Sequence, residues 1–459
     1  MTNILRQARA DKKKFLGELA ANGWFWDVNN LHNRFAYDRA FTPAQIRARW
    51  AEHFGRGAAV PTDFYLHVPF CASRCEYCHF FLAQSRSPEK VDAYLACLED
   101  QFRYFAPVFR GREFRHLYVG GGTPSMLTDA QLRRLLRAVY ANFGFSGRGQ
   151  RTIEANPHTA RPSFFGLVRR FGFNRVSFGV QTLNPAALAV NKRDYQSEAR
   201  IVASIDQARA AGIADINVDL IAGLAGDTDA GFLYSFARLA RLKPDNIVLY
   251  GFMPPRGGYL EHLLKMTRRE FYSSYYPALV RRTLPLLGRL AGKYGYEAES
   301  CDPARWHWGY KRAGQDAGAS GSYGGEYSGC IFGLGHGARS RIHNLLEYRE
   351  EMDLDAPAAR PPVFAGRLSD RREEMIKYVV NSLDQDCVLR PARFAAVFGE
   401  PPEKAFPYAV PALKALGALR GEAGELRFRI RKFSDKYVFA LYFFSPRNAK
   451  PARGAEAER

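Results

Sequence analysis

The sequence predicts an α/β fold, a partial (β/α)6 barrel of the TIM type, because short apolar runs alternate with amphipathic segments from residue 62 to about 255. Six runs have the composition of buried strands: Phe64–Val68, His116–Val119, Thr152–Ala155, Arg175–Phe178, Ile216–Ile221 and Asn246–Tyr250. Helical spacing occupies the intervals, as in Pro88–Phe105, Asp129–Phe143, Glu198–Ala211 and Asp229–Leu242. Such repeats imply parallel strands with crossover helices, and a closed eight-stranded barrel would need two more units.

Two regions flank this barrel, which we expect over 61–260. Residues 1–60 predict a basic, helical N-terminal extension. Residues 261–365 hold a helical run, Arg268–Tyr294, and a Gly- and Ser-rich stretch, Gly314–Gly329, that is typical of a loop or lid on the substrate side.

The C-terminal part predicts a small second domain. Residues 366–445 have mostly helical spacing, with short strands expected at Leu426–Ile430 and Tyr437–Phe444, as in a winged-helix-like module. The last residues, 446–459, are rich in Pro, Ala and Arg and predict a disordered tail.

The composition predicts a globular protein of a reducing compartment. Hydrophobic residues make up 47% and charged residues 24% of the chain. The start, Met1 to Gly17, is charged and has no secretory signal, and the longest late apolar run is too short to span a bilayer. Seven Cys, three of them clustered, fit thiols that serve a metal better than a disulfide framework. We therefore expect a cytoplasmic protein.

The net charge of +20 leaves three interpretations open. It indicates general surface charge, an anionic substrate or electron donor, or nucleic acid. The basic residues are spread along the chain and no separate RNA-binding module is present in the sequence, so a nucleic-acid partner is the least favoured.

The most informative motif is a cluster of three thiols, Cys71, Cys75 and Cys78, directly after the first predicted strand. Three thiolates can hold a four-iron cluster by three corners and leave one iron open, whereas four thiolates close it. A zinc site is the structural alternative. His79 follows Cys78 directly, and adjacent residues rarely ligate one ion together. The remaining thiols are interpreted as buried or incidental: Cys97, Cys301, Cys330 and Cys387.

Further candidates follow the next strands. Gly120-Gly121-Gly122-Thr123-Pro124-Ser125 comes after the second strand, where glycines let the backbone approach a ligand and bare amides bind anions; a tight turn is the alternative. Glu154 ends the third strand, and carboxyl ends of parallel strands face the site in β/α barrels. A solvated strand-end charge is the alternative there.

The fourth and fifth strands add polar groups. Gln181 follows the fourth strand, and Asp219 lies inside the apolar fifth strand, where a charge must be paired or functional. Arg193 is either a partner for an anion or a solvated charge.

Together these motifs resemble the radical S-adenosylmethionine superfamily: Cys-x3-Cys-x2-Cys after the first strand, Gly-Gly-Gly-Thr-Pro after the second and Glu after the third. The longer strings Tyr65–Cys71, Gly179–Gln181 and Val218–Leu224 resemble its HemN-like branch. That branch contains oxygen-independent coproporphyrinogen III oxidases, haem chaperones, anaerobic haem-opening methyltransferases and natural-product C-methyltransferases or cyclopropanases. The resemblance covers about 62–260 and recurs weakly in Gly333–Ala338 and the C-terminal module.

The resemblance implies residue roles. Cys71, Cys75 and Cys78 would ligate a [4Fe-4S] cluster whose fourth iron chelates the amino and carboxylate groups of S-adenosylmethionine, which is cleaved to a 5′-deoxyadenosyl radical. Positions for this first S-adenosylmethionine correspond to Tyr65, Gly121 and Glu154. Positions that hold a second one in the oxidase correspond to Tyr77, Gly122, Thr123, Gln181, Arg193 and Asp219.

Two departures from the oxidase pattern count against porphyrinogen decarboxylation. The oxidase has a further Cys two residues after the third, where this chain has Phe80, and its late contacts fall near Phe252 and Arg339 without a clear match. Phe80 agrees with the C-methyltransferases and also with the haem chaperones. Because a second S-adenosylmethionine implies methyl transfer, we expect a class C type of radical C-methylation, or a related C–C bond formation, on a conjugated small molecule. The stretch Trp306–Tyr310 would line a flat apolar pocket or pack ordinarily under the Gly-rich loop.

Two alternatives remain open at this point. One is a tetrapyrrole enzyme, either a decarboxylase of the oxidase type or a haem-opening methyltransferase. The other is a haem chaperone without catalytic activity. For an enzyme, the expected partners are an aromatic or tetrapyrrole-like substrate and a reductant such as flavodoxin or ferredoxin; no residue that donates the final hydrogen or proton can be named from the sequence.

Overall fold

The computed structural model of the chain describes residues 2–22, 37–57, 60–85, 87–252, 254–255, 258–300, 307–314, 329–357, 361–385, 387–431 and 433–448. They form two compact units. The barrel unit comprises Ala36–Cys301 and Trp306–Ser369, and the terminal unit comprises Met1–Phe35, Asp302–Arg305 and Asp370–Arg459. The expected extension over 1–60 is therefore divided between the two units.

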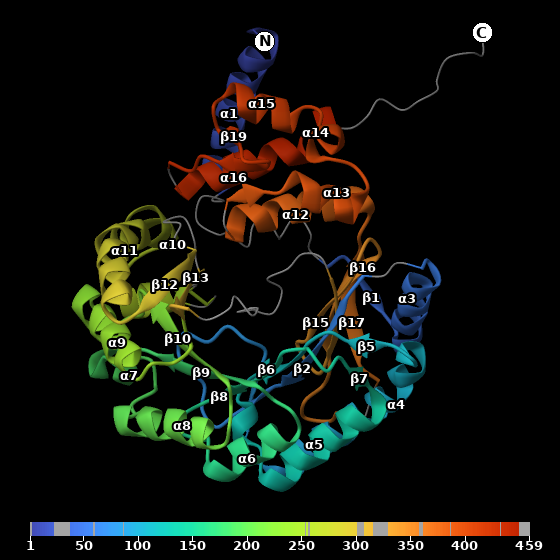
Figure 1. Cartoon of the computed structure of the whole chain (residues 1–459), viewed down its shortest axis with the longest axis vertical. Coiled ribbons are helices and arrows are strands. Elements are labelled where there is room, and N and C mark those ends of the chain that lie inside the picture. The colour runs from blue at the N-terminus through green and yellow to red at the C-terminus, as the bar shows by residue number, and fades with distance from the viewer. Residues whose placement is uncertain are drawn as a thin grey trace. The chain divides into compact units, whose positions relative to one another are not determined.

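Six parallel strands form the centre of the barrel unit and confirm the predicted (β/α)6 core. They are β2 (Thr62–Val68), β6 (Leu117–Gly121), β8 (Arg151–Ala155), β9 (Arg175–Gln181), β10 (Asp215–Ala222) and β11 (Asn246–Gly251), paired in that order. Figure 1 shows the crossover helices along the outer side of this sheet: α4 (Pro88–Phe105), α5 (Asp129–Asn142), α6 (Pro162–Arg170), α8 (Glu198–Ala210) and α9 (Asp229–Arg241).

The helices begin where the sequence supplies a cap. Ser87, Thr128, Ser197 and Thr228 each accept a hydrogen bond from a backbone N–H of the first helical turn. Such caps satisfy donors that a helix leaves unpaired at its start. Each helix then buries an apolar face, as α5 does with Leu132, Leu135, Leu136 and Val139.

The sheet extends beyond the six strands that the sequence predicts. On the β2 side, β14 (Cys330–Leu334) pairs in parallel, and an antiparallel series follows: β15 (Arg339–Ile342), β16 (Leu346–Glu351), β17 (Val363–Leu368) and β1 (Arg39–Phe41). On the β11 side lie the antiparallel strands β13 (His307–Arg312) and β12 (Tyr296–Ser300). The described sheet has thirteen strands, with β1 and β12 at its edges.

Aromatic rings fill the core behind β2 and β14. Phe332 of β14 lies 4.5 Å from Phe109 and 5.4 Å from Phe64, ring centroid to centroid. Trp50 of α3 (Pro43–Gly55) packs on Phe109 at 5.1 Å, and its indole N–H donates to Tyr348 Oη at 2.8 Å. Edge-on and tilted rings at these separations stabilise a core beyond the area that they bury.

A second buried feature of this unit is the carboxyl group of Glu350, which is fully buried on β16. It accepts hydrogen bonds from the Gly335 amide at 2.7 Å and from Gln101 Nε2 at 2.9 Å. Burial raises the pKa of Glu350 from 4.5 to about 7, because these two donors offset only part of the cost of an ion without a cation.

We expect Glu350→Gln to remove a pH dependence of stability. A raised folded-state pKa stabilises the fold below pH 4.5, and this contribution is lost as pH rises through about 7. The loss amounts to about 3 kcal/mol for this group. In the variant, the new amide can donate to Gln101 Oε1, which has no hydrogen-bond partner among the described residues.

Denaturant unfolding at pH 5 and pH 8 measures this effect. The wild-type free energy of unfolding should fall between the two pH values by clearly more than that of Glu350→Gln. Glu351→Gln, an exposed neighbour on the same strand, should behave as wild type. If the free energy of unfolding changed equally between pH 5 and pH 8 in the wild type and in Glu350→Gln, the raised pKa of the buried Glu350 carboxyl would be contradicted.

The terminal unit combines helices with a small sheet, as the winged-helix-like prediction requires. Its helices are α1 (Thr2–Asn22), α12 (Arg371–Gln385), α13 (Pro391–Phe398), α14 (Pro402–Ala405), α15 (Ala409–Ala415) and α16 (Phe433–Phe444). Strands β18 (Val388–Leu389), β20 (Glu425–Phe428) and β19 (Leu419–Glu422) pair in that order, which confirms the strand expected near Leu426.

One element of this unit is predicted wrongly: Tyr437–Phe444 is not a strand but lies within helix α16. Every residue from Tyr437 to Phe443 is at most 2% exposed. A helix that is buried on all sides has a continuous apolar sequence, and periodicity cannot distinguish it from a buried strand.

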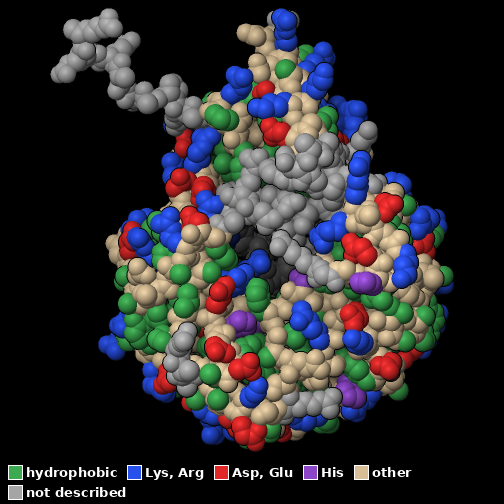
Figure 2. Space-filling model, turned by 180° about the vertical axis from the view of Figure 1, so that it is seen from behind, with side chains coloured by type: hydrophobic (Ala, Val, Ile, Leu, Met, Phe, Trp, Pro, Cys, Tyr) green, Lys and Arg blue, Asp and Glu red, His purple; other side chains and the backbone are tan. Residues whose placement is uncertain are grey.

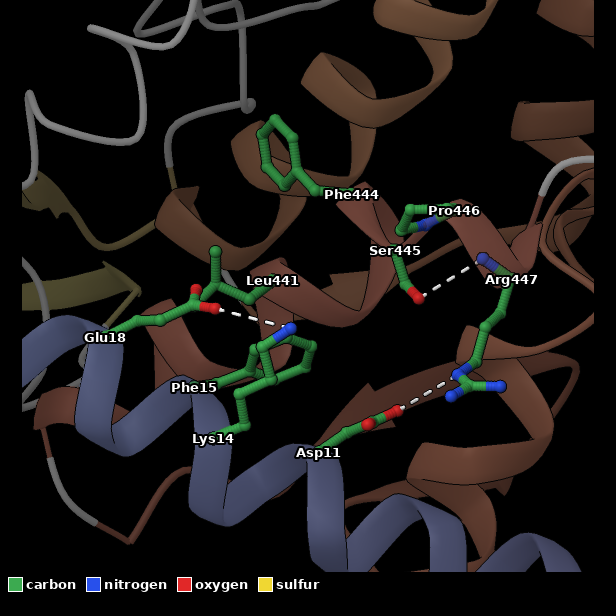
Figure 3. Close-up of a pocket in the computed structure, with 9 residues that line it drawn as sticks. All are labelled: Asp11, Lys14, Phe15, Glu18, Leu441, Phe444, Ser445, Pro446 and Arg447. Atoms are coloured by element: carbon green, nitrogen blue, oxygen red, sulfur yellow. Dashed lines mark hydrogen bonds and ion pairs between the residues drawn. The ribbon is translucent and has the colours of Figure 1, made fainter.

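The terminal unit also holds a cavity of about 380 Å³ between α1 and the end of α16. Figure 3 shows its charged groups paired with one another: Lys14 with Glu18 at 3.8 Å and Arg447 with Asp11 at 3.6 Å. Because its charges are mutually compensated, this cavity shows no preference for an anionic or a cationic ligand.

Several expectations fall wholly or partly outside the described residues, namely Trp306, Cys301, most of Gly314–Gly329 and most of the tail expected over 446–459, of which Pro446–Asn448 form a short 3-10 helix. The helical run Arg268–Tyr294 is confirmed as α10 (Arg268–Glu270), a π-helical turn (Phe271–Tyr275) and α11 (Tyr276–Lys293). In the part of the chain that is described, no helix has the length and apolar character that crossing a membrane requires. Figure 2 shows Lys and Arg side chains dispersed over one face rather than gathered.

Candidate functional site

The three clustered thiols lie in a loop that leaves the carboxyl end of β2. Cys71 ends β3 (Phe70–Cys71), which pairs with β4 (Ala83–Gln84), so that Cys75 and Cys78 lie in the connecting loop. A backbone hydrogen bond from Cys78 N to Cys75 O, 3.1 Å, closes a turn between them. All three are free thiols and partly buried.

Burial disfavours the charged form of these thiols. It raises the pKa of Cys71 to about 11, while the Thr123 hydroxyl, 3.2 Å from Cys71 Sγ, acts in the opposite direction. Burial also raises the pKa of Cys78. Because metal ligation requires thiolates, a cationic metal centre would add to the charge compensation that Arg193 gives these thiols. Three half-buried thiols in one loop have the donor chemistry of an iron–sulfur cluster, although among the described residues no three His, Cys, Asp or Glu side chains are arranged so that they could hold a metal ion.

The glycine turn after β6 holds this loop by backbone contacts. Gly122 N donates to Val68 O and Thr123 N donates to Phe70 O, both at 2.8 Å. A Cβ at Gly122 would lie 2.5 Å from Phe70 O, so only glycine allows this approach. The amides were expected to be bare; instead, each of the three from Gly121 to Thr123 donates to a protein acceptor.

Glu154 is the carboxylate that this turn holds. Tyr118 Oη donates to Glu154 Oε1 at 2.7 Å, and Gly121 N donates to Oε2 at 3.0 Å. Burial raises the pKa of Glu154 to about 7 in spite of these two donors. A nearby cation, such as an ammonium group, would restore its ordinary ionisation.

Tyr65, on β2, faces the same region and is oriented by His67. The His67 Nε2–H donates to Phe81 O at 2.8 Å, which leaves Nδ1 to accept from Tyr65 Oη at 3.0 Å. Burial lowers the pKa of His67 to about 4, so that this neutral tautomer persists at neutral pH. The Tyr65 ring lies 5.9 Å from that of Tyr118.

Arg193 joins the thiol loop to the end of β9. Its Nη1 donates to Tyr77 Oη at 3.0 Å and lies 3.8 Å from Cys75 Sγ, and its Nη2 donates to Gly179 O at 2.6 Å. Arg193 is only 5% exposed, which excludes the interpretation as a solvated charge. Its buried Nε has no hydrogen-bond partner among the described residues.

Asp219 is paired by neutral donors rather than by a cation. Ser177 Oγ donates to Asp219 Oδ2 at 3.0 Å and Asn217 Nδ2 donates to Oδ1 at 2.7 Å. Burial raises its pKa. Asn217 Oδ1 is itself buried without a hydrogen-bond partner among the described residues, which marks a second place where a ligand donor would fit.

Gln181, the last residue of β9, has a backbone φ of +72°. The β9–β10 register shifts here, because Asp219 lies opposite Gly179 and the next residue, Leu220, opposite Gln181. An irregularity at the end of a strand changes the direction in which the neighbouring side chains point.

The sequence did not identify several residues of this region: Tyr118, His67, Ser177, Asn217 and Gln196. Strand alternation gives a usable signal for three of them. Tyr118 and Ser177 lie two residues before Gly120 and Gly179, and Asn217 two before Asp219, so that each shares a face with a motif residue. Phe252, near one of the late positions where the sequence does not clearly match the oxidase, is 2% exposed and packs on the ring of Tyr259.

Comparisons with known proteins identify the family to which this chain belongs. The family model described as the radical SAM superfamily matches residues 65–239. The oxygen-independent coproporphyrinogen III oxidase of Escherichia coli (strain K12) is 32% identical over 236 residues, which are 50% of this chain and 51% of that protein. This chain thus spans about half the length of such oxidases.

The heme chaperone HemW of Mycobacterium tuberculosis (strain ATCC 25618 / H37Rv) is 32% identical over 267 residues, 56% of this chain and 68% of that protein. Among solved structures, coproporphyrinogen III oxidase (HemN) from Escherichia coli superposes with a TM-score of 0.71 at 22% identity, over 91% of this chain and 98% of that one. Structural likeness at this identity shows the fold alone. With the family model and these sequence relatives, it follows that the chain belongs to the HemN-like branch of the radical SAM superfamily.

Proposed function

We propose that this chain is a radical S-adenosylmethionine enzyme whose [4Fe-4S] cluster is ligated by Cys71, Cys75 and Cys78. Membership of the superfamily implies a cluster and S-adenosylmethionine. The observation that carries the residue assignment is the loop with three free, half-buried thiols, set between Thr123 and the Arg193 guanidinium. When bound, the cluster supplies an electron that cleaves S-adenosylmethionine to a 5′-deoxyadenosyl radical.

Tyr65, Gly121 and Glu154 are proposed to hold the first S-adenosylmethionine. Glu154, whose pKa burial raises to about 7, accepts a hydrogen bond from the amino N–H, and this donor favours its ionised form. The Gly121 amide already bonds to Glu154, so Gly121 contributes by orienting that carboxylate and by leaving room beside His67.

A second S-adenosylmethionine is proposed to contact Tyr77, Gly122, Thr123, Gln181, Arg193 and Asp219. Support comes from two buried polar atoms, Arg193 Nε and Asn217 Oδ1, which have no hydrogen-bond partner within the described part of the chain and offer one donor and one acceptor. Asp219 adds a carboxylate suited to ribose hydroxyls.

The reaction that we propose is radical C-methylation, or a related C–C bond formation, on a conjugated small molecule, with one S-adenosylmethionine supplying the radical and the other the carbon. The observation behind this choice is Phe80, which stands two residues after Cys78 in place of the oxidase-type Cys and is 58% exposed. A Phe side chain offers no thiol.

A second candidate is tetrapyrrole chemistry or haem delivery. It is favoured by the 32% identity both to a coproporphyrinogen III oxidase and to the heme chaperone HemW. Decarboxylation in this candidate would use one S-adenosylmethionine and release carbon dioxide, whereas haem delivery would need no cleavage.

Anaerobic product analysis tests these proposals. The reconstituted protein is supplied with S-adenosylmethionine and dithionite, alone and with coproporphyrinogen III or haem, and 5′-deoxyadenosine and S-adenosylhomocysteine are quantified. Both products together support two-molecule carbon transfer. Deoxyadenosine alone, with a loss of carbon dioxide from the porphyrinogen, supports the oxidase reaction. A Soret band with haem and no cleavage product supports a chaperone and overturns the enzymatic proposal.

A further inference from the structure

Gln196 connects two parts of the candidate site that are far apart in the sequence. It lies between α7 (Pro185–Val190) and α8 and is 6% exposed. Its Oε1 accepts from Arg193 Nη2 at 2.7 Å. Its Nε2 donates to Val180 O and to Thr182 O, both at 3.0 Å. The three bonds use both N–H donors and the carbonyl oxygen of the side-chain amide.

The orientation of this amide is fixed by its neighbours. Both partners of Nε2 are backbone carbonyls, which only accept, and the partner of Oε1 is a guanidinium, which only donates. A flipped amide would make three repulsive contacts in a buried place. Glu at this position would lack donors, and Lys or Arg would lack an acceptor, so Gln alone satisfies both sides.

The two carbonyls flank Gln181, the residue with the left-handed backbone. A non-glycine residue with this φ is strained and persists where the surroundings compensate for it. Arg193 Nη2 adds a bond to the neighbouring Gly179 O. The carbonyls of Gly179, Val180 and Thr182 thus all bond to Arg193 or Gln196.

The other end of Arg193 reaches the thiol loop, through Tyr77 and Cys75. A guanidinium on a flexible side chain contributes little unless its position is fixed. We infer that Gln196 is a positioning residue, whose amide locks Arg193 against the thiol loop and at the same time supports the left-handed turn at Gln181. Its consequence for S-adenosylmethionine binding rests on the proposed function; the lock itself does not.

Two substitutions separate the two halves of this role. Gln196→Glu keeps an acceptor for Arg193 and removes both donors to the carbonyls. Gln196→Met keeps the length of the side chain and removes all three bonds. Gln131→Met is the matched control, because Gln131 is 8% exposed, its Oε1 accepts from Thr128 N and its Nε2 donates to Asp92 Oδ1, at the start of α5 and on α4 rather than at the end of β9.

Hydrogen exchange read by mass spectrometry on the purified, cluster-free chain tests the lock. We expect backbone amides of 179–183 to exchange about tenfold faster in both Gln196 variants, since each loses two buried hydrogen bonds. Amides of 191–197 should exchange faster in Gln196→Met but not in Gln196→Glu. Unchanged exchange over 179–183 in Gln196→Met, or the same increase in Gln131→Met, would overturn the inference.

Equilibrium dialysis of S-adenosylmethionine with the reconstituted protein tests the consequence. Gln196→Met should bind it about 10–100-fold more weakly, as for other residues that orient a ligand-binding group, with the iron content unchanged. Wild-type affinity in Gln196→Met would overturn the positioning role. If the wild type itself binds neither iron nor S-adenosylmethionine, the proposed function fails, and the exchange experiment alone then decides on the lock.

Discussion

Replacing Cys71, Cys75 or Cys78 with Ser is expected to abolish cluster assembly and with it the reductive cleavage of S-adenosylmethionine, by at least about a thousandfold. A cluster that has only three protein ligands cannot lose one and remain stable, and an alcohol does not substitute for a thiolate towards iron. Iron and inorganic sulfide are quantified after anaerobic reconstitution, together with 5′-deoxyadenosine.

Cys97→Ser is the matched control for these variants. Cys97 is also a free, partly buried thiol, but it lies on α4, outside the thiol loop. It should retain wild-type iron, sulfide and cleavage. Retention of four irons and of cleavage in any of the three loop variants would remove that residue from the ligand set.

The second large effect is expected at Glu154. Glu154→Gln should weaken S-adenosylmethionine binding about 10–100-fold at pH 7, because the charged acceptor for the amino N–H is lost. The fold should persist, since an amide of the same size can still accept from Gly121 N and donate to Tyr118 Oη.

The pH dependence of binding gives a sharper test of Glu154. Because its pKa is raised to about 7, the ionised form that accepts a hydrogen bond from the amino group is scarce at pH 5.5 and increases towards pH 7. The amino group must itself lose a proton to bind iron, so affinity should rise with pH in every variant, but the rise over this interval should be roughly tenfold larger in the wild type. Glu154→Gln should lack this additional tenfold rise. Glu350→Gln, which removes another buried carboxyl with a pKa of about 7, should show the wild-type rise. If it does not, the group whose ionisation changes the affinity is not Glu154 alone.

The positions of the candidate residues follow from a rule that the sequence alone can apply. Carboxyl ends of parallel strands meet at one edge of a sheet, and this rule places Glu154, Gln181 and Asp219 towards the same edge. The parallel pairing of β8 with β9 and of β9 with β10, in which Asp219 lies opposite Gly179, confirms that these strands are neighbours.

The hydrogen-bonding partners of those residues follow from no such rule. The bonds of Asp219 to Ser177 and Asn217 depend on the register in which β9 pairs with β10, and the bonds of Gln196 depend on how the loop after α7 folds back. The amides of the glycine turn looked available in the sequence because nothing there shows that Phe70 and Val68 would accept from them. Local patterns predict on which strand or turn a side chain lies, and tertiary contacts determine its hydrogen-bonding partners.

The added strands illustrate a different limit. Strand β14 is a seventh parallel strand, but it follows a long interval without β–α alternation, so periodicity gave no reason to place it beside β2. Helix α16 was predicted as a strand because burial on all sides erased its amphipathic pattern.

Mössbauer spectroscopy of the ⁵⁷Fe-reconstituted protein, with and without S-adenosylmethionine, tests most directly whether three thiolates leave one iron open. We predict that one iron in four changes its isomer shift when S-adenosylmethionine is added, while three keep theirs. Four irons that do not respond, or a protein that takes up zinc in place of iron and sulfide, would contradict this account.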